Sequence, residues 1–184
     1  MQTIGEKGPQ RVSFPRPAET LLLGRHDNQR VDISAKTDYA IRALLALAGV
    51  VDEGAGTMSV DALVVDQGLP RKFLESILAD LRRGGLVTSR RGPGGGYALA
   101  RAASQIRLGD VFRAVDGPLA EVRGRRPHET AYDGVAEHLP VVWVALRSSL
   151  RQVLDETTIE DVRTGSLPPH VVELAEVPDA WRNR

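Results

Sequence analysis

The sequence predicts a mainly α-helical fold with one small β-hairpin, and three observations support this prediction. Apolar residues recur at helical spacing over residues 34–52, 59–67, 70–83 and 140–156. The glycine- and arginine-rich stretch 84–99 has the pattern of two short strands joined by a loop. Aromatic residues make up only 4% of the 184 residues, so Leu, Val, Ile and Ala must build the core.

The first helix is expected to begin after a poorly structured segment. Residues 1–30 contain scattered charges and prolines without sustained periodicity, which predicts a disordered N-terminal extension. Ser34 is a suitable N-cap for a helix that ends near Asp52. The apolar residues of this helix recur at helical spacing: Tyr39, Ala43, Leu44, Leu47 and Val51.

Two further helices follow, joined by a tight turn at residues 68–70. Ser59 caps the first, in which Ala62, Leu63 and Val65 are expected to pack on the preceding helix. The second helix begins after Pro70 and carries a regular apolar stripe, made of Phe73, Leu74, Ile77, Leu78 and Leu81. Its opposite face is polar and mostly basic: Arg71, Lys72, Glu75, Ser76, Arg82 and Arg83. This arrangement is typical of a helix-turn-helix.

The predicted hairpin places Arg90, Arg91 and Gly92 at a loop. Such glycines allow positive φ angles and close approach of the backbone, and each arginine can release a counterion from a DNA phosphate. Together with the preceding helices, the hairpin predicts a winged helix-turn-helix DNA-binding domain over residues 31–118. A winged helix used for protein contact is the alternative. Such domains often lose basic residues from these two elements, whereas here they are the most basic.

The C-terminal third is predicted to mediate dimerisation. Residues 119–139 are expected to form a loop, residues 140–165 a long helix and a short final helix, and residues 166–184 a tail. The long helix has an apolar side that a small winged domain cannot cover: Val142, Trp143, Leu146, Leu150 and Val153. We expect a second copy to cover it in a homodimer. Packing back onto its own domain is the alternative.

Charge and composition exclude several classes of function. The net charge is zero, yet residues 70–102 hold seven basic and two acidic side chains. This local excess predicts double-stranded DNA as the partner. The chain has no cysteine, which excludes disulfides, a thiol nucleophile and thiolate-held clusters. We find no catalytic motif, secretion signal or membrane-spanning segment, so we expect a cytoplasmic protein that is not an enzyme.

Several segments resemble the Rrf2 family of bacterial winged-helix transcriptional regulators. The resemblance runs through residues 33–43, the Leu74–Leu81 helix, Gly85–Ser89, Arg91–Tyr97 and Asp110–Pro118. It implies a dimeric, sequence-specific DNA-binding regulator, more often a repressor. The helix after Pro70 would enter the major groove and the wing the minor groove, with the C-terminal helix forming the dimer.

The resemblance also implies roles for individual residues. Lys36 and Tyr39 fall where family members contact phosphates. Lys72, Glu75 and Ser76 fall on the face that contacts bases, and Arg91 suits a narrow minor groove. Glu75 could instead form a helix-surface pair with Arg71 or Lys72.

The chain departs from the family in the loop before the tryptophan-bearing helix. Many relatives hold an iron–sulfur cluster there with three cysteines, and this chain offers none, so we expect no cofactor. The loop contains polar residues whose spacing matches no known metal-ligand pattern, so we expect no metal: His128, Glu129, Tyr132, Asp133, Glu137 and His138. A small-molecule effector, a partner protein and no ligand at all remain as alternatives.

Overall fold

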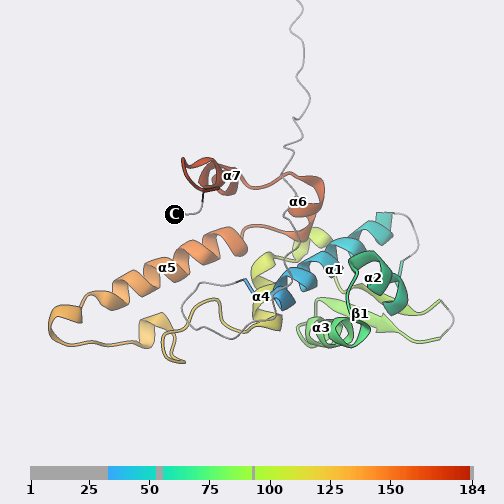
Figure 1. Ribbon diagram of the computed structural model, residues 1–184, viewed down its shortest axis with the longest axis horizontal. Helices are drawn as coiled ribbons and strands as arrows, with labels where there is room; N and C mark the ends of the chain where they lie inside the picture. The colour runs from blue at the N-terminus through green and yellow to red at the C-terminus, as the bar shows by residue number, and fades with distance from the viewer. Residues whose placement is uncertain (1–32, 53–55, 93, 183–184) are drawn as a thin grey trace, which may run out of the picture. The chain divides into compact units, whose positions relative to one another are not determined.

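The computed structural model describes residues 33–52, 56–92 and 94–182, which belong to one unit, Ile33–Arg184 (Figure 1). The predicted disordered extension, residues 1–30, lies outside the described residues. The helices are α1 (Ala35–Asp52), α2 (Val60–Gln67), α3 (Arg71–Arg83), α4 (Leu108–Val115), α5 (Leu139–Leu154), α6 (Ile159–Thr164) and α7 (Pro169–Glu176). Two strands, β1 (Val87–Arg90) and β2 (Gly96–Leu99), complete the mainly α fold that the sequence predicts.

The core forms where α1 meets α2, α3, α4 and α6. On α3 the predicted stripe is confirmed, since Leu74, Ile77, Leu78 and Leu81 are fully buried and Phe73 is partly buried. Fully burying a leucine-sized side chain contributes about 1.5–3 kcal/mol, so this stripe fixes α3 on the domain.

The prediction for α2 was partly wrong. Leu63 is buried as expected, but Ala62 and Val65 are exposed. The inward face of this short helix follows the i, i+3, i+4 positions that begin at Val60, which brings Leu63 and Val64 toward the core. Ala62 and Val65, two and five positions after Val60, therefore point to solvent.

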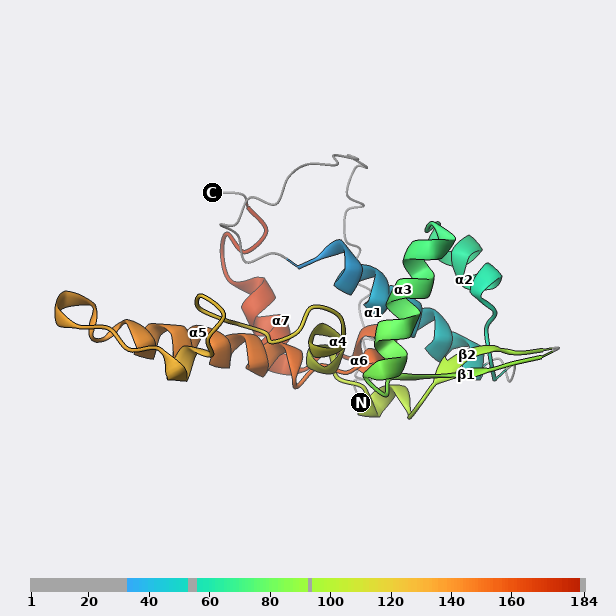
Figure 2. The ribbon, with the colours of Figure 1, turned by 90° about the horizontal axis from the view of Figure 1, so that it is seen from below.

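The predicted wing is confirmed as an antiparallel pair in which Val87 faces Leu99 and Arg90 faces Gly96. Figure 2 shows β1 and β2 side by side, extending away from the helices. At its tip, Gly92 and Gly94 have φ angles of 98° and 73°, which L side chains rarely adopt. Along β2, Met58 and Tyr97 exchange two backbone hydrogen bonds of 2.8 Å each, which fix the hairpin to the segment before α2.

Helix α4 contacts both α1 and α3. The Asp116 carboxylate at its C-terminus accepts hydrogen bonds from the hydroxyls of Ser34 (2.6 Å) and Thr37 (2.7 Å) at the start of α1. At the C-terminus of α3, a Cβ on Gly84 would lie only 2.7 Å from the Cβ of Ala114. Close packing of α3 on α4 therefore requires a glycine at position 84.

A capping box begins α6, since Thr158 and Asp161 bond to one another's backbone amides. Ile159 is fully buried in the main core, and its amide donates to the carbonyl of Ile106 (2.9 Å). Helix α6 therefore packs in the main core, although the sequence grouped it with the dimerisation helix.

Residues 116–138 connect α4 to α5 and contain two short 3-10 turns, Pro127–Glu129 and Gly134–Ala136. The segment 166–184, predicted to be a tail, contains the helix α7. Pro169 begins this helix at a position where its missing N–H costs no hydrogen bond. Within the described part of the chain, no helix is long and apolar enough to cross a membrane.

Candidate nucleic-acid interface

Helix α3 presents a polar face opposite its buried stripe. Pro70 precedes its first turn, and its carbonyl accepts from the amides of Phe73 (3.0 Å) and Leu74 (3.1 Å). On the outer face, Lys72, Glu75 and Ser76 are exposed to solvent. These are the three positions that the resemblance assigns to contact with bases.

Two of the predicted contact residues on α3 are paired with one another. Arg71 donates from Nε to Oε1 of Glu75 (2.9 Å) and also pairs with Asp61 of α2. The hydrogen bond to Glu75 is the largest cause of the raised pKa of Arg71. The structure thus contains the helix-surface pair considered as the alternative for Glu75. A base that binds Glu75 must compete with Arg71 for the same carboxylate.

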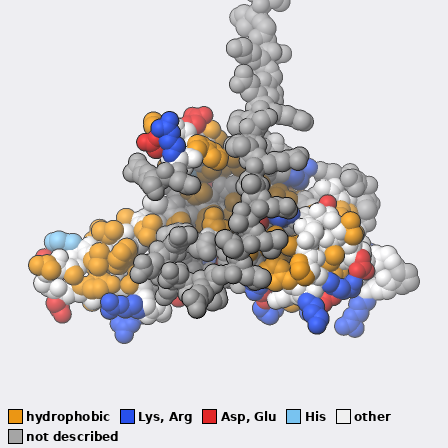
Figure 3. Space-filling model, viewed as in Figure 1, with side chains coloured by type: hydrophobic (Ala, Val, Ile, Leu, Met, Phe, Trp, Pro, Cys, Tyr) orange, Lys and Arg blue, Asp and Glu red, His pale blue; other side chains and the backbone are white. Residues whose placement is uncertain are grey.

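Unpaired cations line the rest of this surface. Lys72, Arg90 and Arg91 are exposed, and among the described residues none of them forms an ion pair. Arg82 donates weakly to the Ser89 hydroxyl (3.4 Å), which joins the end of α3 to β1. Gly92 is exposed beside Arg91. Figure 3 shows Lys and Arg side chains along the lower edge, over the region where Figure 1 places α3.

Lys36 and Tyr39 lie deeper than their predicted phosphate contacts suggest. Lys36 pairs with Asp80 of α3, whose side chain also pairs with Arg83 and is only 8% exposed. The ring of Tyr39 packs edge-on against Phe73, with centroids 5.7 Å apart. In this structure both residues therefore hold α1 against α3.

Sequence reasoning did not identify Asp80 as the centre of this arrangement. It is nearly buried at a position beside the apolar stripe, and it binds a cation from each of two helices. The one local signal was the i, i+3 spacing to Arg83.

Helix α5 presents the opposite kind of face. None of its residues is buried, and large side chains are exposed along it: Val141, Val142, Val144 and Leu146. Trp143, Leu150 and Val153, also predicted at the dimer interface, are half-buried. Figure 3 shows this apolar surface at the left, over α5.

The loop before α5 does not fit an iron–sulfur cluster. It has no thiolate, since the chain has no cysteine. Its histidines lie beside neighbouring acids, with His128 Nε2 at 3.8 Å from Glu129 Oε1 and His138 Nε2 at 3.3 Å from Glu137 Oε1. Among the described residues, no group of three or more His, Asp or Glu side chains is arranged to hold a metal ion.

Comparison of this chain with known proteins identifies its family. Residues 33–164 match the Rrf2 family, described as iron-dependent transcriptional regulators. The chain belongs to the Rrf2 family. This family assignment and the regulators to which the chain is similar make it a DNA-binding transcriptional regulator with a winged helix-turn-helix.

Relatives of this Rrf2 protein are named as regulators of the same kind. The chain is 47% identical over 145 residues to Rv1287 of Mycobacterium tuberculosis, provisionally named an HTH-type transcriptional regulator, covering 78% of this chain and 88% of that one. It is 32% identical over 130 residues to the HTH-type transcriptional regulator CymR of Bacillus subtilis, covering 71% and 88%.

Solved structures give the same result. The structure of CymR, titled the global cysteine regulator of B. subtilis, matches with a TM-score of 0.61 and 31% identity over 73% of this chain and 97% of that one. That of T. potens IscR matches with a TM-score of 0.57 and 32% identity over 73% and 88%.

Proposed function

We propose that this regulator is a homodimeric repressor that binds an operator with α3 in the major groove and the wing in the minor groove. We further propose that it does so without an iron–sulfur cluster. The observation that carries the proposal is a set of exposed cations on α3 and the wing that form no ion pair with any described residue: Lys72, Arg90 and Arg91.

The outer face of α3 has suitable chemistry for contact with base edges. Lys72 can donate to guanine O6 or N7, and the Ser76 hydroxyl can donate or accept. Glu75 can accept from a cytosine amino group once it leaves Arg71. The buried stripe on the other face holds the α3 backbone in place, so entry into the groove requires rearrangement only of side chains such as the Arg71–Glu75 pair.

The wing suits a narrow minor groove. Arg91 is exposed next to Gly92 at the start of the loop between the strands. A narrow minor groove concentrates negative potential and attracts an inserted arginine.

The apolar face of α5 supports a dimer. Four large side chains stay exposed there, and the described part of the chain offers no element that covers them. Two of them, Val142 and Leu146, lie on the same side of the helix as Trp143, Leu150 and Val153. Pairing this side with the same side of a second copy would bury it and place two α3 helices on one operator. A dimer bound across a promoter blocks polymerase without further contacts, which favours repression.

Binding to a fragment of the chain's own promoter, measured by fluorescence anisotropy at increasing salt, tests the proposal. We expect two chains per operator and an affinity that falls steeply with salt. Arg91→Ala should weaken binding and reduce the magnitude of the log–log salt slope by about 0.9, because one phosphate-bound counterion is no longer released. Arg125→Ala, an exposed arginine in the loop before α5, is the matched control and should leave the slope unchanged.

Base selection by α3 has a separate readout. Lys72→Ala should reduce the preference for one base pair of each half-site by about 1–3 kcal/mol in a competition with single-site variants. An unchanged preference, or equal salt slopes for Arg91→Ala and the parent, would contradict this docking. In vitro transcription that rises on addition of the protein would contradict repression.

A further inference from the structure

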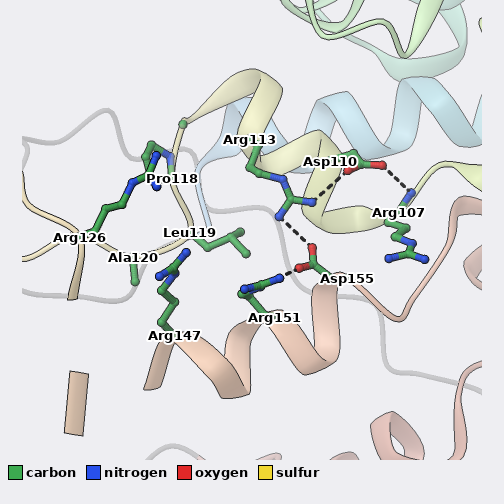
Figure 4. A pocket seen from close by; sticks show the side chains of 11 residues that line it. Arg107, Asp110, Arg113, Pro118, Leu119, Ala120, Arg126, Arg147, Arg151 and Asp155 are labelled. Atoms are coloured by element: carbon green, nitrogen blue, oxygen red, sulfur yellow. Dashed lines mark hydrogen bonds and ion pairs between the residues drawn. The ribbon is translucent and has the colours of Figure 1, made fainter. Parts of the chain in front are cut away.

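A cavity of about 570 Å³ lies between α4, the segment that follows it and α5 (Figure 4). Five arginines line it: Arg107, Arg113, Arg126, Arg147 and Arg151. Only two carboxylates, those of Asp110 and Asp155, accompany them. The lining therefore carries three more positive than negative charges, in a chain whose net charge is zero.

Both carboxylates are already engaged by two of the arginines. Arg113 Nη2 lies 2.9 Å from Asp110 Oδ1, and Arg113 Nη1 lies 2.8 Å from Asp155 Oδ1. Arg151 donates from Nε to Asp155 Oδ2 (3.1 Å). Burial alone would raise the pKa of Asp155, but the bonds from these arginines lower it below its ordinary value. Asp155 is therefore a firmly ionised partner and leaves no negative charge for the remaining cations.

Three guanidinium groups are left without a carboxylate among the described residues. Arg107 and Arg126 form no ion pair there, and the polar contact of Arg147 is with His128 Nδ1 (3.3 Å). Uncompensated like charges at one cavity repel one another, and a bound anion would relieve that repulsion.

The backbone is shaped to allow this arrangement. A Cβ on Gly109 of α4 would lie 2.0 Å from Asp155 Oδ1 and 3.1 Å from the Arg113 guanidinium nitrogens. Any side chain at this position would force apart the ion pair that joins α4 to α5. The glycine therefore permits the close contact that forms one wall of the cavity.

We propose that this cavity binds a small organic anion with at least two negative charges, a di- or tricarboxylate or a phosphate ester, as the effector of the regulator. Guanidinium groups bind carboxylate and phosphate oxygens in bidentate fashion. Pro118, Leu119 and Ala120 supply an apolar wall for the carbon skeleton of such a ligand. The effector role rests on the proposed function, whereas the binding site does not.

Helix α4 can transmit occupancy of the cavity to the DNA-binding surface. Its Arg113 lines the cavity, and the next residue, Ala114, packs against Gly84 at the end of α3. The C-terminus of α4 is also bonded to α1 through Asp116. An anion that draws Arg113 away from Asp155 would therefore move a helix on which α3 directly packs.

Isothermal titration calorimetry on the full chain, at constant ionic strength, tests the site with three probes. Citrate represents the carboxylates, fructose 1,6-bisphosphate the phosphate esters, and inorganic phosphate the minimal anion. We expect citrate or the bisphosphate to bind at least tenfold more tightly than inorganic phosphate, and the stronger of the two identifies the class. Arg126→Gln and Arg147→Gln should each weaken binding at least tenfold.

Arg125→Gln is the matched control, because it removes the same charge from the position next to Arg126 but does not line the cavity. Failure of the parent chain to bind either organic anion at millimolar concentration would overturn the site. So would an equal loss in Arg125→Gln and Arg126→Gln, which would show a general charge effect. Operator binding measured on the same samples separates the two proposals: unchanged DNA affinity with a saturating anion removes the effector role alone, whereas no DNA affinity in any sample removes the proposed function.

Discussion

Helices α3 and α5 are both amphipathic, yet they complete their packing in different ways. On α3 the apolar stripe is buried within the chain, and what faces solvent is polar and basic. On α5 no residue is buried, and what faces solvent is largely apolar. The same kind of sequence pattern therefore leads to a buried apolar stripe on α3 and to exposed apolar side chains on α5.

The difference shows which functions a single copy can perform. The α3 surface needs only the core beneath it, so Lys72 is exposed before DNA binds, whereas Glu75 must first leave Arg71. The α5 surface is the one for which we propose a partner, because large apolar patches on monomers mark interaction sites. Variants that affect one helix and spare the other can therefore test the comparison directly.

The largest effect is expected from truncation of the α3 stripe. Leu78→Ala should lower the free energy of unfolding by about 2–5 kcal/mol, since it leaves a cavity at a fully buried position. Leu146→Ala on α5, measured by urea unfolding in dilute solution where chains are monomeric, should cost less than about 1 kcal/mol, because that side chain is 41% exposed. Equal losses would contradict the contrast between the helices.

A smaller effect is expected on association. Leu146→Asp places a carboxylate in the proposed interface and should raise the dimer dissociation constant about 100-fold, equivalent to about 2.8 kcal/mol. Val65→Asp is the control, because Val65 is an apolar residue of α2 that is already 83% exposed. Sedimentation velocity should show dissociation of the first variant alone, and dimers that persist in Leu146→Asp would remove α5 as the interface.

The smallest effect concerns the ion pair between Asp155 at the end of α5 and Arg113 of α4. The folded state lowers the pKa of Asp155 below its ordinary value of 3.8, so the ionised form stabilises the fold. That stabilisation is fully present above the pKa of the unfolded chain and is lost as pH falls through the folded pKa. Asp155→Asn should therefore lower the free energy of unfolding by about 1 kcal/mol at pH 7. The difference in this free energy between the variant and the parent should become smaller below pH 3.8.

Urea unfolding at several pH values measures this difference. Asp133→Asn, which changes an exposed carboxylate in the loop before α5, is the control and should stay close to the parent at neutral pH. If the difference in free energy of unfolding between Asp155→Asn and the parent does not change with pH, the loss comes from packing and not from the ion pair.

Local sequence patterns predicted most of the fold. The spacing of the apolar residues between Pro70 and Arg83 defined both faces of α3, because helical geometry converts spacing directly into direction. The same rule did not fix α2, where eight residues allow two phases of similar apolar content. Helix α7 lies in the segment predicted to be a tail, and it begins directly after Pro168 with Pro169 in its first turn, where proline is well tolerated.

Contacts between distant segments could not be predicted. Lys36 pairs with Asp80, 44 residues away, so no local spacing indicates that this lysine is engaged within the domain. The Arg71–Glu75 pair was foreseen as an alternative because its partners lie four residues apart. The arginine-lined cavity draws its residues from α4, α5 and the connecting loop, which only the folded chain brings together.

The return of α6 to the core has a consequence for operator architecture. At its carboxyl end, α5 is tied to α4 through Asp155, and four residues later the chain enters the core at Ile159. These two attachments limit the movement of α5 relative to α3, so the proposed dimer would hold its two α3 helices at one fixed separation. Half-sites must then recur with the helical repeat of about 10–10.5 base pairs. Inserting about half a turn between them would place one half-site on the far side of the duplex, out of reach of the second subunit.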